Sequence, residues 1–367
     1  MLIFGFISTL FIVLIFTHFF IYKSIVFFLN FTNPTILWSI RIALITLVLC
    51  FVASMMIASR YDNIFTEIFY TFSAGWLTFL NYLFWSSLVL WIIFSISKFL
   101  QFSLDFKIVS TIVFSLGILT GIYGLINAQI IRITPITVKI QNLPDSWLNK
   151  KAVWISDVHL GQVHKEGFAQ TITEKINALK PEIVFIGGDL YDGVKTDLDK
   201  VTLPLNELKA PQGIYFITGN HEEFSDVSQY INAVKNIGIK VLDNERVLID
   251  GVEIIGVDYN DSQNKTKFAE TLTSLKLKNT PTILLKHAPT SLDIAAKAGV
   301  DLTISGHTHK AQMFPLNFFT YLIYKGFDYG LNDYGKMQVY TSSGTGTWGP
   351  PARVGSISEI VEFTFTK

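Results

Sequence analysis

Four long apolar segments in the first third of the chain constrain its fold more than any other feature. They cover about Leu2–Ile21, Ile36–Ala58, Tyr70–Ile96 and Ile108–Ala128. A bilayer core requires roughly 20 mostly apolar residues per helix, so each segment is long enough to cross a membrane. Residues 1–128 also hold only 8 of the 58 charged residues, which leaves 50 for the other 239. We therefore predict a transmembrane domain of four helices over residues 1–128, the alternative being four buried helices in a large soluble core.

The ends of these segments suggest a topology. Residues 1–22 carry no charge, no cleavage site for a signal peptidase is evident, and three further segments follow, so a cleaved signal peptide is not expected. Lys and Arg residues are more frequent around the first and third loops than on the opposite side. The residues counted are Lys23, Arg41, Lys98 and Lys107 against Arg60 and Arg132. The positive-inside rule then predicts a multi-pass membrane protein with both termini, and the domain after the spans, on the extracytoplasmic side.

The overall charge and the cysteine content exclude some classes of partner. The formal net charge is zero, so no nucleic acid is expected as an electrostatic partner. The single cysteine, Cys50, lies in an apolar segment and excludes a disulfide within one chain. The oligomeric state is left open.

After Ala128 the pattern changes to short apolar runs that alternate with polar, helix-like stretches. We predict a linker and first strand over residues 129–148 and an α/β domain over residues 149–367. Five of the short runs end in turns that are rich in Gly, Asp or His; they are Ala152–Ile155, Ile183–Ile186, Gly213–Ile217, Thr282–Leu285 and Leu302–Ser305. Val247–Asp250 and Glu253–Val257 are expected to form a hairpin.

Polar side chains follow the ends of these five predicted strands. In open α/β sheets, sites form outside the carboxyl ends of the strands, so the side chains should converge on one edge. The residues concerned are Asp157, His159, Asp189, Asn220, His221, His287, His307 and His309. Carboxylate, amide and imidazole ligands together suit zinc or a divalent transition metal better than calcium. A bridging carboxylate would hold two ions roughly 3.5–4 Å apart, a pair that activates water and stabilises a phosphoryl group during in-line attack.

In their order, these residues resemble a known family. The segments Asp157-Val158-His159, Gly188-Asp189, Gly219-Asn220-His221-Glu222, His287 and Gly306-His307-Thr308-His309 are similar to the five motifs of the calcineurin-like metallophosphoesterases. The resemblance covers about residues 150–345. It implies a four-layer α/β/β/α sandwich, two divalent metal ions such as Mn, Fe or Zn, and hydrolysis of a phosphoester by metal-bound hydroxide.

The resemblance also assigns roles to single residues. Asp157, His159 and His309 would bind one metal, and Asn220, His287 and His307 the other. Asp189 would bridge the two ions. His221 would bind no metal and would instead stabilise the phosphate or protonate the leaving group, a task that suits imidazole. His18 and His164 match no family position and are given no role.

The combination of N-terminal spans with this domain resembles a membrane-bound subgroup of the family, some members of which are similar to enzymes that cleave lipid-linked pyrophosphates or phosphodiesters. In that subgroup the last motif often continues as Gly-Gly-Gln. Here it continues as Lys310-Ala311-Gln312, which keeps the metal ligands and alters the loop beside them.

Three further features bear on the substrate. Met313–Tyr324 is strongly apolar but too short to span a membrane; it would either pack on the sheet as part of the core or dip into the bilayer beside the site. Gly344–Gly349 has the residue pattern of a dinucleotide-binding fingerprint. That function is not expected, because Pro350 and Pro351 prevent the required helix from starting there. We expect instead a turn that brings Trp348 or Arg353 towards the site, with Arg353 as a phosphate contact.

Asp192 and Glu222 flank the site. Their side chains could equally well hold the metal ligands in place or be solvated as ordinary loop residues.

The sequence thus predicts a membrane-anchored metal-dependent hydrolase that cleaves a phosphodiester or pyrophosphate bond, with a lipid- or envelope-linked substrate favoured by the spans. The alternatives are a non-catalytic membrane scaffold that uses the fold as a binding surface, and a transporter or sensor with an accessory phosphoesterase domain.

Overall fold

The computed structural model describes residues 2–224 and 226–367. Met1, where the predicted transmembrane domain begins, lies outside the described residues. The chain forms two compact units. One contains residues up to Ile126 together with Gly349–Ala352, and the other contains Asn127–Trp348 and Arg353–Lys367.

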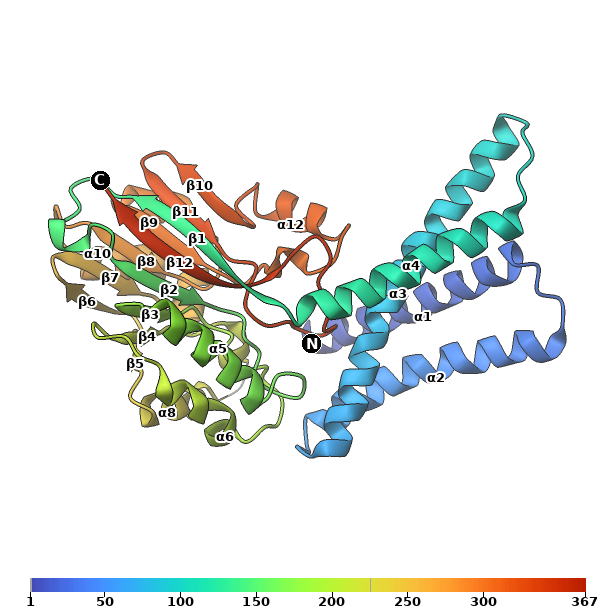
Figure 1. Cartoon of the computed structure of the whole chain (residues 1–367), viewed down its shortest axis with the longest axis horizontal. Helices are drawn as coiled ribbons and strands as arrows, with labels where there is room; N and C mark the ends of the chain where they lie inside the picture. The colour runs from blue at the N-terminus through green and yellow to red at the C-terminus, as the bar shows by residue number, and fades with distance from the viewer. Residues whose placement is uncertain (1, 225) are drawn as a thin grey trace. The chain divides into compact units, whose positions relative to one another are not determined.

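The first unit consists of long apolar helices. Their bounds are α1 Leu2–Phe28, α2 Pro34–Ala58, α3 Ile64–Phe99 and α4 Phe106–Ala128 (Figure 1). Each contains one predicted span, and each is long and apolar enough to cross a membrane. Asn33 and Asn63 start α2 and α3 by accepting hydrogen bonds from the first free backbone N–H groups of each helix.

The outward faces of these helices decide between a membrane and a soluble core. In α2, Leu44 and Val48 are buried, whereas Ile42, Ile45 and Leu49 face outward and are 57 to 60% exposed. A helix in a soluble core would bury such side chains, while a helix in lipid presents them to acyl chains. These exposed apolar faces favour membrane helices over four core helices.

The second unit contains two six-stranded mixed sheets. Sheet one has the order β1-β12-β2-β3-β4-β5, and sheet two the order β10-β11-β9-β8-β7-β6. The strands of sheet one are β1 Ile131–Lys139, β2 Lys151–Ile155, β3 Ile183–Ile186, β4 Ile214–Phe216, β5 Lys240–Val241 and β12 Ser358–Thr366. Those of sheet two are β6 Glu245–Ile249, β7 Val252–Gly256, β8 Thr282–Leu285, β9 Leu302–Ser305, β10 Gly330–Tyr334 and β11 Met337–Thr341. The predicted hairpin is confirmed as the antiparallel pair β6 and β7.

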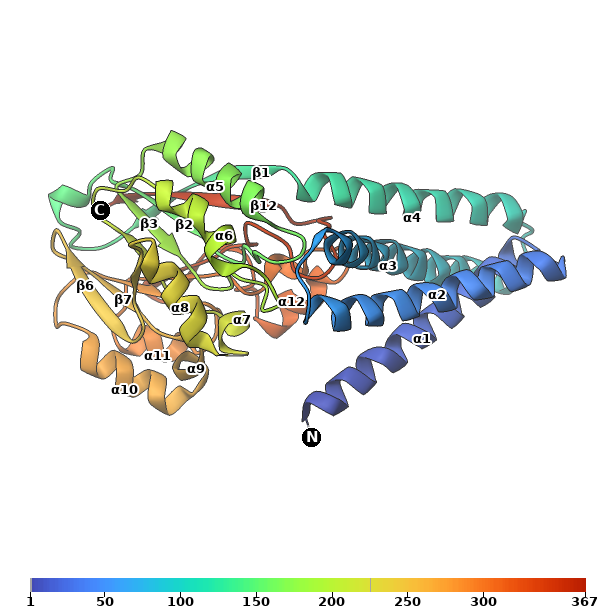
Figure 2. The same cartoon turned by 90° about the horizontal axis from the view of Figure 1, so that it is seen from below.

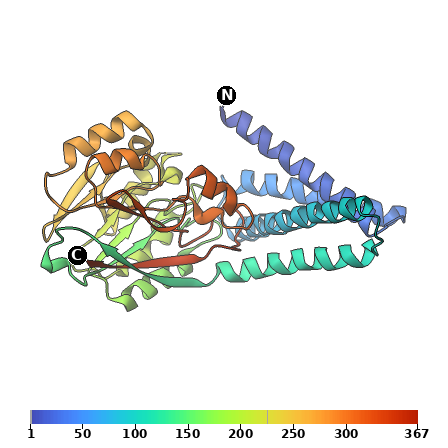
Figure 3. The ribbon, with the colours of Figure 1, turned by 90° about the horizontal axis from the view of Figure 1, so that it is seen from above.

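The first strand and the last lie side by side, so residues far apart in the sequence close one side of sheet one (Figure 3). β1 pairs in parallel with β12 from Ile131 and Ser358 onwards, and β12 pairs antiparallel with β2.

Helices cover the outer face of each sheet. On sheet one lie α5 Glu166–Leu179, α6 Leu198–Thr202 and α8 Val227–Asn236, and on sheet two lie α10 Lys265–Leu275 and α11 Leu292–Lys297 (Figure 2). The remaining helices and 3-10 turns lie in loops: α7 Asn220–Glu223, α9 Tyr259–Gln263, α12 Asn317–Ile323, η1 Asp145–Trp147, η2 Leu203–Glu207 and η3 His309–Ala311.

β2 shows how the layers are built. Val153 and Ile155 pack under the helices, while Ala152 and Trp154 pack between the two sheets, as the two-residue period of a strand requires. Apolar side chains on both faces explain why the short strands are continuous apolar runs. The predicted four-layer α/β/β/α sandwich is confirmed.

Candidate metal centre

The eight predicted site residues follow the carboxyl ends of five strands. Asp157 and His159 follow β2, Asp189 follows β3, and Asn220 and His221 open α7 after β4. His287 follows β8, and the pair His307 and His309 follows β9. β2, β3 and β4 are parallel neighbours in sheet one, and β8 and β9 are parallel neighbours in sheet two. We call these eight residues the rim.

One group in the rim consists of Asp157, His159 and His309. The Nε2 atoms of the two histidines lie 3.1 Å apart, and His309 Nε2 lies 3.4 Å from Asp157 Oδ1. All three side chains are buried. One ligand atom from each lies within 4.8 Å of the others, close enough for a single cation.

A second group surrounds His287. Its Nε2 atom lies 3.2 Å from each of Asp189 Oδ2, Asn220 Oδ1 and His307 Nδ1. Its Nδ1–H donates to the Gly187 carbonyl over 2.8 Å, so Nε2 is the nitrogen that faces the site. Asp189 Oδ2 also lies 4.0 Å from His159 Nε2, which places this carboxylate between the two groups.

His221 is held differently from the other histidines. It lies near Asp189 and His159 and is itself able to join a metal-binding group with them. However, its Nδ1–H donates to the carbonyl of Asp192 over 2.9 Å, and its backbone N–H donates to Asp189 Oδ1 over 2.8 Å. The ring is therefore fixed by the loops on either side of it, and among the described residues its Nε2 atom has no hydrogen-bond partner.

The protonation of these groups suits cation binding. Burial lowers the pKa of His159 and of His309 below that of ordinary histidine, and the neutral ring is the form that binds metals. Burial alone would raise the pKa of Asp189, but the charge and hydrogen bond of His287 hold it below the usual range. Imidazole nitrogens beside a buried carboxylate, with their ligand atoms facing one another, fit two divalent transition-metal or zinc ions.

The backbone of the rim is strained. Asp157, His159, Asp189, His307 and His309 all have φ values between 49° and 71°, in the left-handed region that side chains other than glycine rarely adopt. Each such residue costs about 1–3 kcal/mol, and such conformations cluster at functional sites. Here the loops are held by each other, since the N–H of Asp157 donates to the Gly188 carbonyl and that of His159 to the Asp189 carbonyl.

Glycines precede several rim residues because there is no space for a side chain. A Cβ atom on Gly306 would lie 2.2 Å from Asp157 Oδ2, and one on Gly219 would lie 2.2 Å from Asp189 Oδ1. Both distances are far below van der Waals contact. The Gly–His and Gly–Asn pairs of the motifs thus follow from the close approach of loops at the rim, between the two sheets for Gly306 and within sheet one for Gly219.

Glu222 supports the rim from below. It is fully buried and accepts hydrogen bonds from three backbone N–H groups, those of Gly219 at 2.7 Å, Asp189 at 2.9 Å and Tyr191 at 3.1 Å. Burial raises the pKa of Glu222 to about 7. Its position favours support of the ligand loops over ordinary solvation.

Asp192 and His164 also hold the rim in place. Asp192 accepts from His221 through its carbonyl, and its Oδ1 lies 3.5 Å from His159 Nδ1. His164 is buried, stacks on Phe168 and accepts a hydrogen bond from the backbone N–H of Thr347 over 3.1 Å. It therefore anchors the loop that presents Trp348.

Arg353 has a different setting from the predicted phosphate contact. It is fully buried, and its guanidinium donates to the carbonyls of Ser343 and Gly346 at 2.7 and 2.6 Å, with a longer contact to the His309 carbonyl at 3.4 Å. Backbone carbonyls, not a phosphate, are its partners, so we correct the expectation: Arg353 stabilises the turn. The other member of that turn, Trp348, is half exposed, and its ring lies edge-on to His221 at 5.6 Å.

Several aromatic residues around the rim were not anticipated. The Tyr259 ring lies 5.8 Å from that of His287, and the Tyr324 ring lies 6.4 Å from that of His307. Phe224 lies 5.3 Å from His221. A signal for Tyr259 was present, because it follows β7, which is parallel to β8 and ends at the same edge. Tyr324 and Phe224 lie in loops that carry no such signal.

The altered loop after the last motif keeps a conformation that glycine favours. Lys310 and Ala311 have φ values of 48° and 53°, and Gln312 has 56°. The Lys310 ammonium lies over the Tyr329 ring at 4.4 Å. Gln312 bonds both the N–H and the carbonyl of Trp348, at 2.7 and 3.0 Å. The loop thus adopts left-handed backbone at two positions that lack glycine, and it fixes the position of Trp348.

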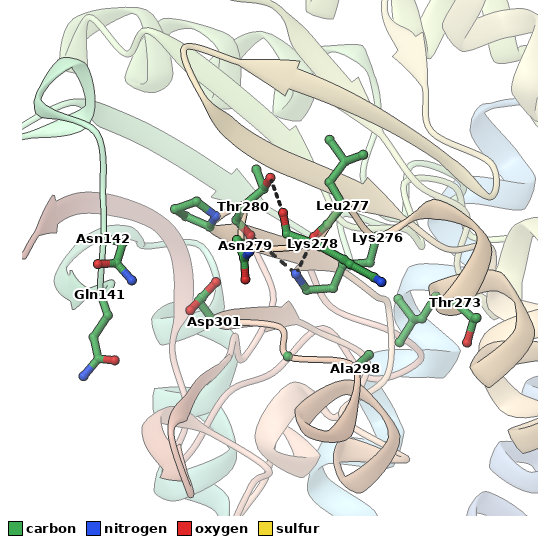
Figure 4. A pocket seen from close by; sticks show the side chains of 13 residues that line it. Gln141, Asn142, Thr273, Lys276, Leu277, Lys278, Asn279, Thr280, Ala298 and Asp301 are labelled. Atoms are coloured by element: carbon green, nitrogen blue, oxygen red, sulfur yellow. Dashed lines mark hydrogen bonds between the residues drawn. The ribbon is translucent and has the colours of Figure 1, made fainter.

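A second concavity lies before β8 and β9 begin, at the edge opposite the rim. It is lined by loop residues that include Lys276, Lys278, Thr280 and Asp301 (Figure 4). The Lys276 ammonium donates to the carbonyls of Leu277 and Thr280 at 3.1 and 3.4 Å, so its hydrogen bonds serve the loop itself.

Comparison with known proteins agrees with this geometry. The family model for calcineurin-like phosphoesterases matches residues 150–311. An uncharacterized metallophosphoesterase of Aquifex aeolicus is 32% identical over 256 residues, which cover 68% of this chain and 97% of that protein. The chain belongs to the calcineurin-like metallophosphoesterases.

Other relatives share only part of their length with this chain. An uncharacterized metallophosphoesterase of Helicobacter pylori is 34% identical over 57% of this chain and 58% of its own length. The transmembrane protein with metallophosphoesterase domain of Bos taurus is 34% identical over 66% of this chain and 59% of its own length. Among solved structures, a novel archaeal phosphodiesterase is similar at a TM-score of 0.32 and 18% identity, covering 53% of this chain and 84% of that one. Four apolar helices ahead of the family domain, together with a relative named as transmembrane, indicate a membrane protein of this family.

Proposed function

We propose that this chain is a membrane-anchored dinuclear-metal phosphoesterase that hydrolyses a phosphodiester or pyrophosphate bond. Asp157, His159 and His309 would hold one metal, and Asn220, His287 and His307 the other, with the Asp189 carboxylate shared. Two divalent ions at such a site activate a water molecule as nucleophile and neutralise charge on the phosphoryl oxygens. The single observation that supports the proposal is that Asp189 lies between two groups of buried ligand atoms.

The proton that the leaving group requires is assigned to His221. Because Nδ1–H of His221 is bonded to the Asp192 carbonyl, the ring is oriented, and in its imidazolium form it would carry at Nε2 a second proton that passes to the departing oxygen and leaves a neutral ring. Its backbone bond to Asp189 keeps the ring at the metal ligands. His221 therefore acts on the side of the leaving group, not as a ligand.

The membrane spans guide the proposal on substrate and location. A phosphoester that is linked to a lipid or to the cell envelope would be concentrated where the chain is anchored, and we propose a substrate of this class. The distribution of Lys and Arg favours an extracytoplasmic domain. In sealed vesicles of known orientation, an added protease should digest the domain only from the extracytoplasmic side; digestion only from the other side would contradict this topology.

The test of the function compares two carboxylate substitutions in the full-length protein. With Mn²⁺ and a chromogenic phosphodiester, Asp189→Asn should lower the rate roughly 100-fold or more, because the shared ligand supplies several kcal/mol of charge stabilisation. Asp293→Asn, on the exposed side of α11, should leave the rate unchanged. Wild-type activity in Asp189→Asn, or no activity in the wild type with Mn, Fe or Zn, would contradict the proposal.

A further inference from the structure

Helix α12 exposes an apolar surface that the metal centre does not explain. No residue of α12 is buried. The residues with large exposed apolar side chains on the helix and just before it, which we call the α12 surface, are Phe314, Phe318, Phe319, Tyr321, Leu322 and Ile323. Leu322 and Ile323 are 70 and 69% exposed. The expectation of a core segment packed on the sheet is wrong for this helix.

The concentration of these side chains is unusual within the domain. Twelve large apolar side chains are exposed among the described residues from Asn127 onwards, and six of them belong to the α12 surface. The others are scattered, such as Leu203 and Leu248. Single exposed apolar residues are common in soluble proteins, whereas a contiguous patch marks a surface that meets a partner or a membrane.

The start of the α12 surface is hydrogen-bonded to the segment 353–356, which is also hydrogen-bonded to Asn127 at the end of the last apolar helix. The N–H of Phe314 donates to the Val354 carbonyl over 2.7 Å. The neighbouring carbonyls of Arg353 and Ser356 accept from the side chain of Asn127, at 2.9 and 3.3 Å. Asn127 lies in the last turn of α4. The start of α12 is therefore linked by hydrogen bonds to the residue at which the chain leaves its last span.

The other end of α12 reaches the metal centre. Tyr324, which caps the helix, has its ring 6.4 Å from that of His307. Asp328 joins the helix to the ligand loop, since its carboxylate accepts from Thr320 at 3.0 Å and its carbonyl accepts from Thr308 at 2.7 Å. α12 therefore connects the membrane attachment of the domain to the rim.

We propose that the α12 surface inserts into the acyl-chain layer of the membrane that anchors this chain, so that lipid head groups lie beside the rim. The chemistry at the end of the helix fits an interface, because Tyr321, Tyr324 and Lys325 combine apolar bodies with polar ends that remain in water. The choice of lipid over a protein partner follows from the two hydrogen-bonded steps that link Phe314 to Asn127, the residue at which the chain leaves its last span. Insertion of the α12 surface does not depend on the proposed function. Only the conclusion that a lipid substrate would meet the rim rests on that function.

The insertion is tested with fluorescent labels on the full-length protein in phosphatidylcholine vesicles. Cys50 is the only cysteine, so Cys50→Ser provides a background for Leu322→Cys and for the control Leu248→Cys, which is 58% exposed on β6. Brominated lipid should quench the label at 322 several-fold more than the label at 248, and aqueous iodide should do the reverse. Equal iodide quenching at both positions would overturn the proposal. A label at 322 that is protected from both quenchers would also overturn it, because a protein would then cover the surface.

Activity measurements separate this proposal from the proposed function. Phe318→Ser combined with Phe319→Ser should lower turnover of a phosphodiester lipid in the vesicle at least fivefold and leave a soluble phosphodiester unaffected. Leu203→Ser, at a scattered exposed position, should change neither rate. Equal losses on both substrates would overturn the role of the α12 surface. If the wild type cleaves neither substrate while the label at 322 meets brominated lipid, the proposed function fails and the insertion stands.

Discussion

The rim buries polar side chains, and the α12 surface exposes apolar ones. Both regions therefore depart from the usual distribution of side chains between the interior and water. In the rim, Asp157 and His287 are fully buried, although carboxylates and imidazoles are normally hydrated. On α12, Phe318 and Leu322 are 60 and 70% exposed, although such side chains normally lie inside. Each departure has a cost that folding alone does not explain. The rim could hold cations, and we propose that the α12 surface meets lipid, so each departure agrees with a proposed ligand.

The two regions also differ in how firmly they are held. Rim residues have left-handed φ values fixed by hydrogen bonds between loops and by buried carboxylates below them. α12 is attached through Phe314 before it, Thr320 within it and Tyr324 at its end. Substitutions in the rim should therefore act on chemistry, and substitutions on α12 should act on access to the membrane.

The largest effect on activity is expected at His221, apart from loss of a metal ligand. Replacement by Ala should lower kcat about 10²–10⁴-fold, the usual contribution of a positioned acid. The loss should be greater for poor leaving groups than for activated phenols. Metal content should stay at the wild-type level. A parallel loss of bound metal would show instead that His221 is a ligand and that the rim contains a larger ligand set.

A smaller effect is expected at the support below the rim. In Glu222→Gln, an amide NH2 group that cannot accept a hydrogen bond would face at least one of the three backbone N–H donors. Metal affinity or activity should therefore fall roughly 10- to 100-fold. Glu223→Gln is the matched control, since Glu223 accepts from the Asn260 side chain near the surface. Titration of both variants with Mn²⁺ measures the difference. Equal affinities would mean that the rim is rigid without its buried carboxylate.

Trp348 lies at the border of the two regions, exposed like α12 and in ring contact with His221. Trp348→Ala should raise KM roughly two- to tenfold for substrates with an apolar leaving group, as expected for one lost aromatic contact. The value of kcat should change less. Steady-state kinetics with apolar and polar leaving groups would check this. A fall in kcat alone would assign Trp348 to the positioning of His221.

The smallest effect concerns stability. Ala311→Gly should raise the free energy of unfolding by about 0.5–1 kcal/mol, because Ala311 has a left-handed φ of 53°. The same substitution at Ala296, inside α11, should lower it by about 0.5–1 kcal/mol. Denaturant unfolding of the domain signal compares the two. Destabilisation of similar size at both positions would mean that the loop is not strained.

Much of the fold was predictable because local and global signals agree. The run Ile183–Ile186 is apolar on both faces and ends at glycines, so a buried strand followed by a site loop was the direct interpretation. The four spans were predictable because length and composition suffice. The five motifs predicted which residues should converge, and the structure brings their ligand atoms together in two groups. The metal-binding roles themselves remain predictions.

The features that the sequence could not predict depend on contacts with residues that are distant in the chain. Met313–Tyr324 has the same apolar composition whether it meets a core or a lipid layer, so its exposure required the structure. Arg353 was expected as a phosphate contact at the rim, yet the carbonyls of a glycine-rich turn accept hydrogen bonds from its guanidinium. Phe224 and Tyr324 meet the rim through loop geometry, for which periodicity gives no signal.

The metal content of the purified full-length protein tests the dinuclear centre most directly. After loading with Mn²⁺ and removal of free ions, elemental analysis should find two ions per wild-type chain. It should find fewer in Asp189→Asn, because that carboxylate is shared between the groups. One ion or none per wild-type chain, or two in Asp189→Asn, would contradict a dinuclear centre built around Asp189.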